Sequence, residues 1–185
     1  PRRIELLRNL GLHFEVVKPL WETRIKNGDP IEIAKLTALE KARAVAGMFT
    51  EGLIIGADTI VVINGDILGK PRNEDEARSF LRRLSGRVHE VITGIAVVDA
   101  GGGKEAMDFE VTRVKFRELD EDEIELYVRS GEPFDKAGGY GIQGLASLFV
   151  EWINGDFYNV VGLPLVKLYL LLKEFGYDML SEIVK

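Results

Sequence analysis

Residues 53–63 read LIIGADTIVVI, and this run decides the fold. Most of its side chains are aliphatic, as in a strand that is buried inside a sheet, and Asp58 interrupts them. The next two residues, Asn64 and Gly65, form a pair typical of tight hairpin turns, so the chain should return beside this strand over 67–69. The sequence therefore predicts a sheet with residues 53–63 in its interior.

Apolar residues recur at helical spacing in several segments outside this strand. Capping residues mark two helix starts, Asp29 before Pro30 and Asn73 with Glu76 three residues later. Helices are expected at 1–10, 30–47, 73–85, 120–130 and 164–176, and further strands at 14–17, 88–98, 105–116 and 148–153. This order predicts an α/β fold with a mixed, twisted sheet and flanking helices.

The composition is that of an ordinary globular domain. The chain has 185 residues, of which 46% are hydrophobic and 29% charged, so a single domain is expected. The absence of cysteine excludes disulfides, zinc–thiolate sites and thiol catalysis. A net charge of −6 argues against nucleic acid and anionic membranes as partners. No apolar run reaches about 18 residues, so we expect a soluble cytoplasmic protein.

Asp58 is the most informative polar residue of the central strand. An ionised carboxylate among apolar neighbours costs several kcal/mol unless a cation or a metal meets it. It belongs either to a structural ion pair or solvated strand end, or to a functional site. Lys70, between Gly69 and Pro71 across the predicted hairpin, could reach the same region, or it is an ordinary surface lysine.

Three other cations also have two interpretations each. Lys41 borders the apolar stripe of the helix at 30–47, as a boundary lysine that reaches solvent or as a phosphate contact. Arg2 and Arg3 stand at a helix N-terminus, where N–H and guanidinium groups suit a phosphate, or they are simply solvated. Glu22 lies in a loop and indicates nothing by itself.

Residues 136–144 read KAGGYGIQG, which contains the dinucleotide-binding spacing of glycines. A helix should follow that motif, but a strand-like run follows here, so we reject the dinucleotide interpretation. The glycines instead indicate backbone packed closely against a ligand or another loop, and Gln143 offers a donor and an acceptor for a base edge. Cations and separated carboxylates in one domain suit phosphoanhydride hydrolysis with a hard divalent ion.

Seven stretches of the sequence carry a family resemblance when they are taken in order. They are PRRIELL (1–7), EKA (40–42), GADT (56–59), LGKP (68–71), LSGRVHEVITG (84–94), KAGGYGIQG (136–144) and NVVGLP (159–164). Together they resemble the Maf family of nucleoside triphosphate pyrophosphatases, across nearly the whole chain. The ordered set is much more specific than any single stretch.

The resemblance implies hydrolysis of a nucleoside triphosphate to the monophosphate and pyrophosphate, on a fold similar to that of inosine triphosphatases. The run 136–144 resembles the branch that acts on dTTP and UTP rather than the 7-methyl-GTP branch. Such enzymes are viewed as house-cleaning enzymes that use a divalent cation, Mg²⁺ or Mn²⁺. The family tends to form homodimers, and the apolar helix at 164–176 could belong to an interface or to the core.

The resemblance also implies roles for individual residues. Asp58 would be the base that activates water and a metal ligand, and Glu22 would assist the metal. Lys41 and Lys70 would hold phosphates. Arg2, with Arg3, matches the triphosphate and specificity corner, and Thr59 and Gln143 match positions tied to base choice.

The resemblance leaves an alternative function open, since the family is also linked to arrest of cell division. That alternative is a non-catalytic, nucleotide-sensing regulator of division and septum formation. We expect residues 1–185 to form a single Maf-like domain with two lobes around a central cleft. The family pattern begins with a strand and a serine-rich loop that precede Pro1; both are missing from this sequence, so a serine phosphate contact is not assigned.

Overall fold

A computed structural model describes residues 1–19, 21, 25 and 28–184. The strands are β1 (Leu53–Ile63), β2 (Asp66–Leu68), β3 (Val88–Asp99), β4 (Glu105–Phe116) and β5 (Val150–Asn154). The α-helices are α1 (Arg2–Asn9), α2 (Pro30–Ala46), α3 (Glu74–Leu84), α4 (Glu121–Arg129), α5 (Phe157–Val161), α6 (Leu165–Glu174) and α7 (Met179–Ile183). Short 3-10 helices lie at η1 (Glu132–Asp135), η2 (Ala137–Gly139) and η3 (Leu145–Leu148).

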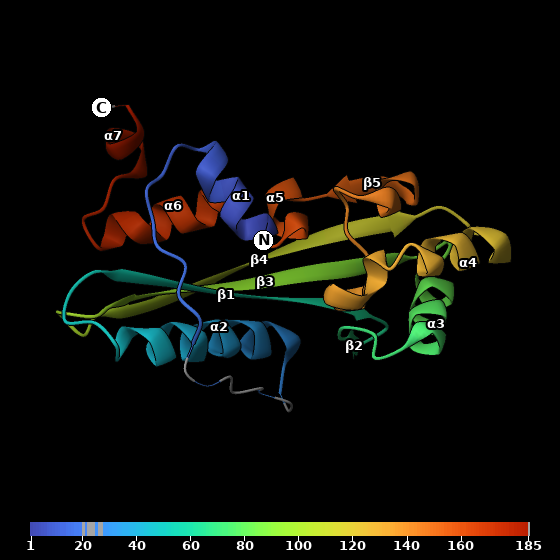
Figure 1. The fold of residues 1–185 in the computed structure, drawn as a ribbon, viewed down its shortest axis with the longest axis horizontal. Helices are drawn as coiled ribbons and strands as arrows, with labels where there is room; N and C mark the ends of the chain where they lie inside the picture. The colour runs from blue at the N-terminus through green and yellow to red at the C-terminus, as the bar shows by residue number, and fades with distance from the viewer. Residues whose placement is uncertain (20, 22–24, 26–27, 185) are drawn as a thin grey trace. The chain divides into compact units, whose positions relative to one another are not determined.

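The strands pair in the order β2-β1-β3-β4-β5, which Figure 1 shows with the helices around them. β1 and β2 are antiparallel, with Val61 opposite Leu68. Between them Asn64 and Gly65 both have positive φ, 52° and 82°, as a tight hairpin turn requires. The hairpin predicted from the Asn-Gly pair is therefore confirmed.

The chain divides into two compact units. The first unit contains Pro1–Asp58, Thr93–Glu110 and Gly162–Lys185, and the second contains Thr59–Ile92 and Val111–Val161. Strands β1, β3 and β4 each contribute residues to both units. The boundary in β1 falls between Asp58 and Thr59, so two neighbouring candidate residues are assigned to different units.

In the first unit, the backbone of α2 lies directly against the backbone of two strands. A Cβ atom added at Gly56 of β1 would lie 2.2 Å from the carbonyl oxygen of Ala38. One added at Gly94 of β3 would lie 2.4 Å from the carbonyl oxygen of Ala34. Small residues on both surfaces permit this approach. Figure 1 shows α2 on one side of the strands, and α1 and α6 on the other.

In the second unit, the core centres on aromatic rings from separate elements. Phe116 is fully buried and makes edge contacts with His89 and Tyr140, at centroid distances of 5.1 and 4.8 Å. Phe149 packs on Phe116 and on Tyr127 of α4. Edge-to-face packing of this kind adds to the stabilisation from buried area alone.

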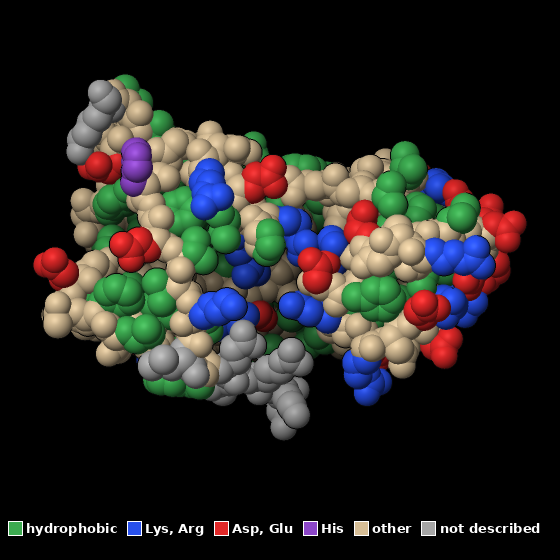
Figure 2. Space-filling view, viewed as in Figure 1, with side chains coloured by type: hydrophobic (Ala, Val, Ile, Leu, Met, Phe, Trp, Pro, Cys, Tyr) green, Lys and Arg blue, Asp and Glu red, His purple; other side chains and the backbone are tan. Residues whose placement is uncertain are grey.

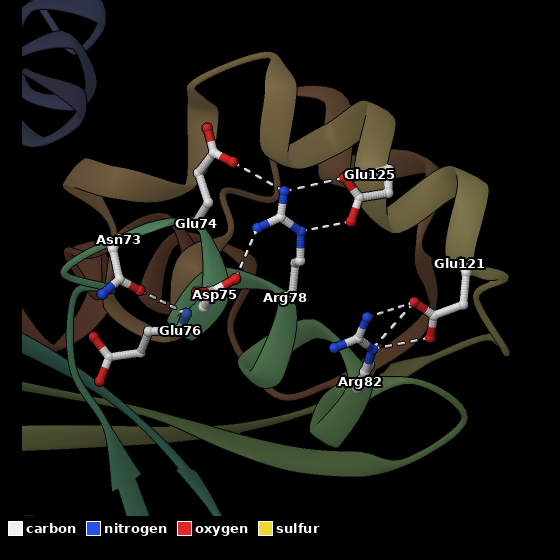
Figure 3. Close-up of polar contacts among 8 residues, drawn as sticks. All are labelled: Asn73, Glu74, Asp75, Glu76, Arg78, Arg82, Glu121 and Glu125. Atoms are coloured by element: carbon white, nitrogen blue, oxygen red, sulfur yellow. Dashed lines mark hydrogen bonds and ion pairs between the residues drawn. The ribbon is translucent and has the colours of Figure 1, made fainter.

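Helices α3 and α4 of the second unit are joined by arginine–glutamate pairs. Arg78 binds Glu125 of α4 at 2.5 Å and Glu74 of its own helix at 2.9 Å, while Arg82 binds Glu121 of α4 at 2.6 Å (Figure 3). Figure 2 shows basic and acidic side chains mixed over the end of the molecule that carries these two helices.

The α/β class is confirmed, but the five strands form an antiparallel open sheet and not the mixed sheet that the sequence predicted. Each predicted helix is found, as is each predicted strand except the one at 14–17. Residues 14–17 are irregular, and Phe14 and Val16 keep 36% and 60% of their surfaces exposed. The apolar letters there do not mark a buried strand. Helices α5 and α7 were not predicted. No helix among the described residues combines the length and the apolar character that a membrane crossing requires.

Candidate functional site

Asp58 and Lys41 form an ion pair in the first unit. The Lys41 ammonium donates to Asp58 Oδ1 over 2.6 Å, and the two side chains remain 27% and 20% exposed. The pair is therefore partly buried but open to solvent on one side. Such a charge-assisted bond is short and strong, and it fixes the direction of the carboxylate.

The close packing of α2 explains why these two side chains meet. Asp29 caps the helix by accepting from the Ile31 amide, and Pro30 occupies its first turn. Gly56 then lets the helix approach β1 two residues before Asp58. Because Lys41 is on this helix, its ammonium reaches the carboxylate directly.

Arg3 lies beside the same pair, and its guanidinium donates hydrogen bonds to two backbone carbonyl groups. Its Nε donates to the Gly162 carbonyl at 2.7 Å, and its Nη1 to the Ala57 carbonyl at 2.9 Å. Burial lowers the pKa of Arg3, the charge of Asp58 opposes this shift, and the charge of Arg2 adds to it. Arg3 therefore ties the start of α1 to β1 next to Asp58.

Lys70 is exposed, in the second unit, directly after β2. The carbonyl of its neighbour Gly69 accepts from the Gly138 amide at 3.0 Å. A Cβ atom at Gly139 would contact Pro71 at 3.6 Å. The glycine run therefore lies against the loop that carries Lys70, as close packing on another loop predicts.

Gln143 is exposed on this glycine run, between buried Ile142 and half-buried Gly144. Thr59, the other residue expected to influence base choice, is half-buried on β1. Both belong to the second unit. The structure thus brings together Asp58, Lys41 and Arg3 in one unit, and places Lys70 and Gln143 on adjoining loops of the other.

Glu22, the second expected metal ligand, lies outside the described residues. Among the residues that are described, no three His, Asp or Glu side chains are grouped to hold a metal ion. Of the two expected metal ligands, Asp58 and Glu22, the structure describes Asp58. As an oxygen donor, the Asp58 carboxylate is of the type that Mg²⁺ accepts in proteins, commonly one or two carboxylates together with substrate phosphates.

Two residues of the second unit that join separate segments of the chain were not singled out from the sequence. Glu132 contacts both Tyr127 and the end of the glycine run, through bonds to the Tyr127 hydroxyl and the Leu145 amide. Asn159 is fully buried and donates to the Val91 carbonyl at 3.0 Å. The glycine spacing predicted a partner loop, but it did not indicate which residues would supply the contact.

Fold and site together define a class of protein: an α/β domain with a lysine-paired aspartate in a central strand and a packed glycine loop. The family model described as "Maf: Maf-like protein" matches residues 1–175, and the chain belongs to this family. The resemblance inferred from the seven stretches is therefore confirmed.

Curated relatives match the chain over nearly its whole length. A protein of Dictyoglomus thermophilum is 49% identical over 97% of this chain and 94% of its own, and one of Thermococcus kodakarensis is 50% identical over 98% and 96%. A protein of Clostridioides difficile is 46% identical over 95% and 91%. Each of the three is named dTTP/UTP pyrophosphatase.

Proposed function

We propose that this protein hydrolyses nucleoside triphosphates, chiefly dTTP and UTP and modified pyrimidine analogues, to the monophosphate and pyrophosphate. The observation that carries the proposal is the Lys41–Asp58 pair, in which a carboxylate of the central strand and a lysine ammonium meet in a partly exposed position. The chain that carries this pair belongs to the Maf family. The names of the relatives supply the substrate class. A cytoplasmic location, a homodimer and a single domain with two lobes remain part of the proposal.

Asp58 is the base of the proposed reaction. It takes a proton from water as the water oxygen forms a bond to the α-phosphorus, and the bond from that phosphorus to the bridging oxygen of pyrophosphate breaks. The electron pair of the broken bond leaves with pyrophosphate. Lys41 and Lys70 stabilise the negative charge that develops on the phosphate oxygens.

The remaining candidates are assigned by the bonds they make. Arg2 contacts the triphosphate, while Arg3 holds α1 against the strand of Asp58, since its Nε and Nη1 bind carbonyl oxygens. Asp58 and Glu22 are the proposed ligands of a divalent ion, Mg²⁺ or Mn²⁺, which supplies charge neutralisation on the phosphates. Thr59 and Gln143 contact the base.

The replacement Asp58→Asn tests the proposal, because it removes the base and keeps the shape of the side chain. We expect pyrophosphate release from dTTP to fall by at least about 100-fold, the usual contribution of a general base. Binding of dTTP by calorimetry should change much less. Full activity in this variant would exclude Asp58 as the base, and binding without turnover in the wild-type protein would favour the nucleotide-sensing regulator instead.

A further inference from the structure

The loop 140–145 is held at both ends while its middle residue is exposed. Gln143 is exposed, as is Leu145 at the end of the loop, whereas Tyr140, Gly141 and Ile142 are buried. The Tyr140 hydroxyl lies 2.7 Å from Nε2 of buried His89, which anchors the start of the loop in the core of the second unit. The end of the loop is anchored differently, through a carboxylate.

Glu132 is that carboxylate, and both of its oxygens are engaged. Oε2 accepts from the Leu145 amide at 2.9 Å, two residues after Gln143. Oε1 accepts from the Tyr127 hydroxyl at 3.0 Å. Burial, followed by the charge of Glu132, raises the pKa of Tyr127, so the hydroxyl remains a donor throughout the ordinary pH range. The carboxylate therefore has a fixed orientation.

Two glycines of the loop, Gly141 and Gly144, lie close to the side chains of Lys136 and Glu132. A Cβ atom at Gly144 would lie 2.4 Å from Glu132 Oε1, and one at Gly141 would lie 2.7 Å from Lys136 Cε. The Lys136 ammonium in turn donates to the Glu132 carbonyl at 2.7 Å. A side chain at either position would have to displace these groups from the places they occupy. The close approach fixes the backbone on either side of Gln143.

We propose that Glu132 is a positioning residue for base selection, which acts by holding the loop that presents the Gln143 amide. This inference rests on the proposed function, in which Gln143 reads the base. Thymine and uracil present an N–H group between two carbonyl oxygens, and a carboxamide presents an acceptor and a donor side by side. That match requires a defined orientation of the amide, because a displaced amide loses both bonds together.

The test compares Glu132→Ala with Glu132→Gln, since a glutamine can still accept from the Leu145 amide and pair with the Tyr127 hydroxyl. We expect Glu132→Ala to raise the KM for dTTP by about 10-fold, the size expected for the loss of a hydrogen bond to a charged group, with kcat changed less than about threefold. The preference for dTTP over dCTP should fall by a similar factor. Glu132→Gln should remain close to wild type in both respects.

The double variant Glu132→Ala with Gln143→Ala separates positioning from general stability. If Glu132 acts through Gln143, the double variant should select between dTTP and dCTP no worse than Gln143→Ala alone. Glu151→Ala, an exposed carboxylate of β5, is the matched control and should behave as wild type. Tyr127→Phe removes one bond to Glu132 and should give a smaller change in the same direction, which keeps the test available if Glu132→Ala does not fold.

An unchanged preference in Glu132→Ala and Tyr127→Phe, or additive losses in the double variant, would overturn the inference. If the wild-type protein releases no pyrophosphate, the proposed function fails separately. The same variants are then compared by their Kd values for dTTP and dCTP. A loss of binding preference in Glu132→Ala would support the positioning role, and equal preference would refute it.

Discussion

At the scale of single residues, replacement of Lys41 distinguishes a structural from a functional role of its pair with Asp58. Its ammonium makes one charge-assisted bond of 2.6 Å, and 27% of its side chain remains exposed. We predict that Lys41→Met lowers kcat for pyrophosphate release by about 100-fold, because removal of one preoriented charge from a phosphoryl-transfer site has effects of this order. Lys41→Arg should retain more activity, since it keeps the charge.

The control for this prediction is Lys173→Met, which removes a lysine from the last turn of α6. Its activity should equal that of the wild-type protein. If Lys41→Met also retains full kcat but unfolds at lower temperature, the pair is a structural ion pair, which is the other interpretation that the sequence left open.

His89 gives a prediction for stability against pH. Burial lowers the pKa of His89 from 6.5 to about 4 in the folded protein, whereas the unfolded chain keeps the ordinary value. The unfolded state therefore binds an additional proton between these values, and the free energy of unfolding falls as pH drops from 6.5 towards 4. The loss attributable to His89 is at most about 3 kcal/mol, from the linkage of proton binding to folding.

Urea unfolding at pH 7 and at pH 4.5 checks this prediction, with His89→Phe for comparison. Several carboxylates also pair with arginines, but the pKa of Glu123 is lowered to about 2 by Arg117, so that pair persists at pH 4.5. The variant should lose less stability on acidification than the wild-type protein. Equal losses in both proteins would show that His89 does not contribute.

From the sequence, site residues could be predicted only where the charge of a single residue and its neighbours along the chain indicated a role. Asp58 was identifiable because a charge in an aliphatic strand has to be compensated, and Lys41 because it borders the helix stripe. Arg3 donates to two carbonyl oxygens, which could not be predicted because it depends on where Gly162 lies in the fold. Glu132 could not be found, because its role exists only once the 141–145 backbone packs on it.

At the scale of elements, the close contact between helix α2 and strand β1 at Gly56 leads to a prediction. A methyl group at Gly56 would lie 2.2 Å from a backbone oxygen of α2, which no side-chain rotation can relieve. We predict that Gly56→Ala destabilises the protein by about 1–3 kcal/mol, as overpacking does. It should also lower kcat, because the helix that carries Lys41 has to move away from the strand of Asp58.

Gly47→Ala at the end of the same helix is the matched control. A Cβ atom there would make an ordinary contact of 3.8 Å, and φ is −63°, which any residue adopts. This variant should keep both its stability and its kcat. If Gly56→Ala loses stability but not kcat, the position of α2 does not govern the Lys41–Asp58 contact.

The pairing of α3 with α4 yields a second prediction at this scale. Arg78 bridges Glu74 and Glu125, so its loss leaves two carboxylates of different helices without their shared cation (Figure 3). Arg78→Met should lower the melting temperature, and by more at low than at high salt, since salt screens exposed pairs. Arg72→Met, which breaks a pair with Glu76 alone, should have a smaller effect. Equal melting temperatures in the two variants would contradict the bridging role.

At the scale of the whole molecule, the sequence predicted the elements whose signals are local. The Asn-Gly turn, the caps at Asp29 and Asn73 and the aliphatic run of β1 all gave the correct element. The strand at 14–17 failed because an apolar run does not reveal whether a neighbouring strand exists to pair with it. Helix α5 has only five residues, too short for a periodic pattern.

Removal of a divalent metal should affect the activity of the protein but not its stability. The described residues group no three His, Asp or Glu side chains, so we expect no ion to hold the fold together in that part of the chain. We predict that EDTA abolishes pyrophosphate release, that added Mg²⁺ restores it, and that the melting temperature without nucleotide does not change. With dTTP present, Mg²⁺ should raise the melting temperature, because a ligand that binds the native state stabilises it by mass action. A fall in melting temperature on EDTA treatment alone would instead reveal a resident structural ion, and would place part of its ligand set outside the described residues.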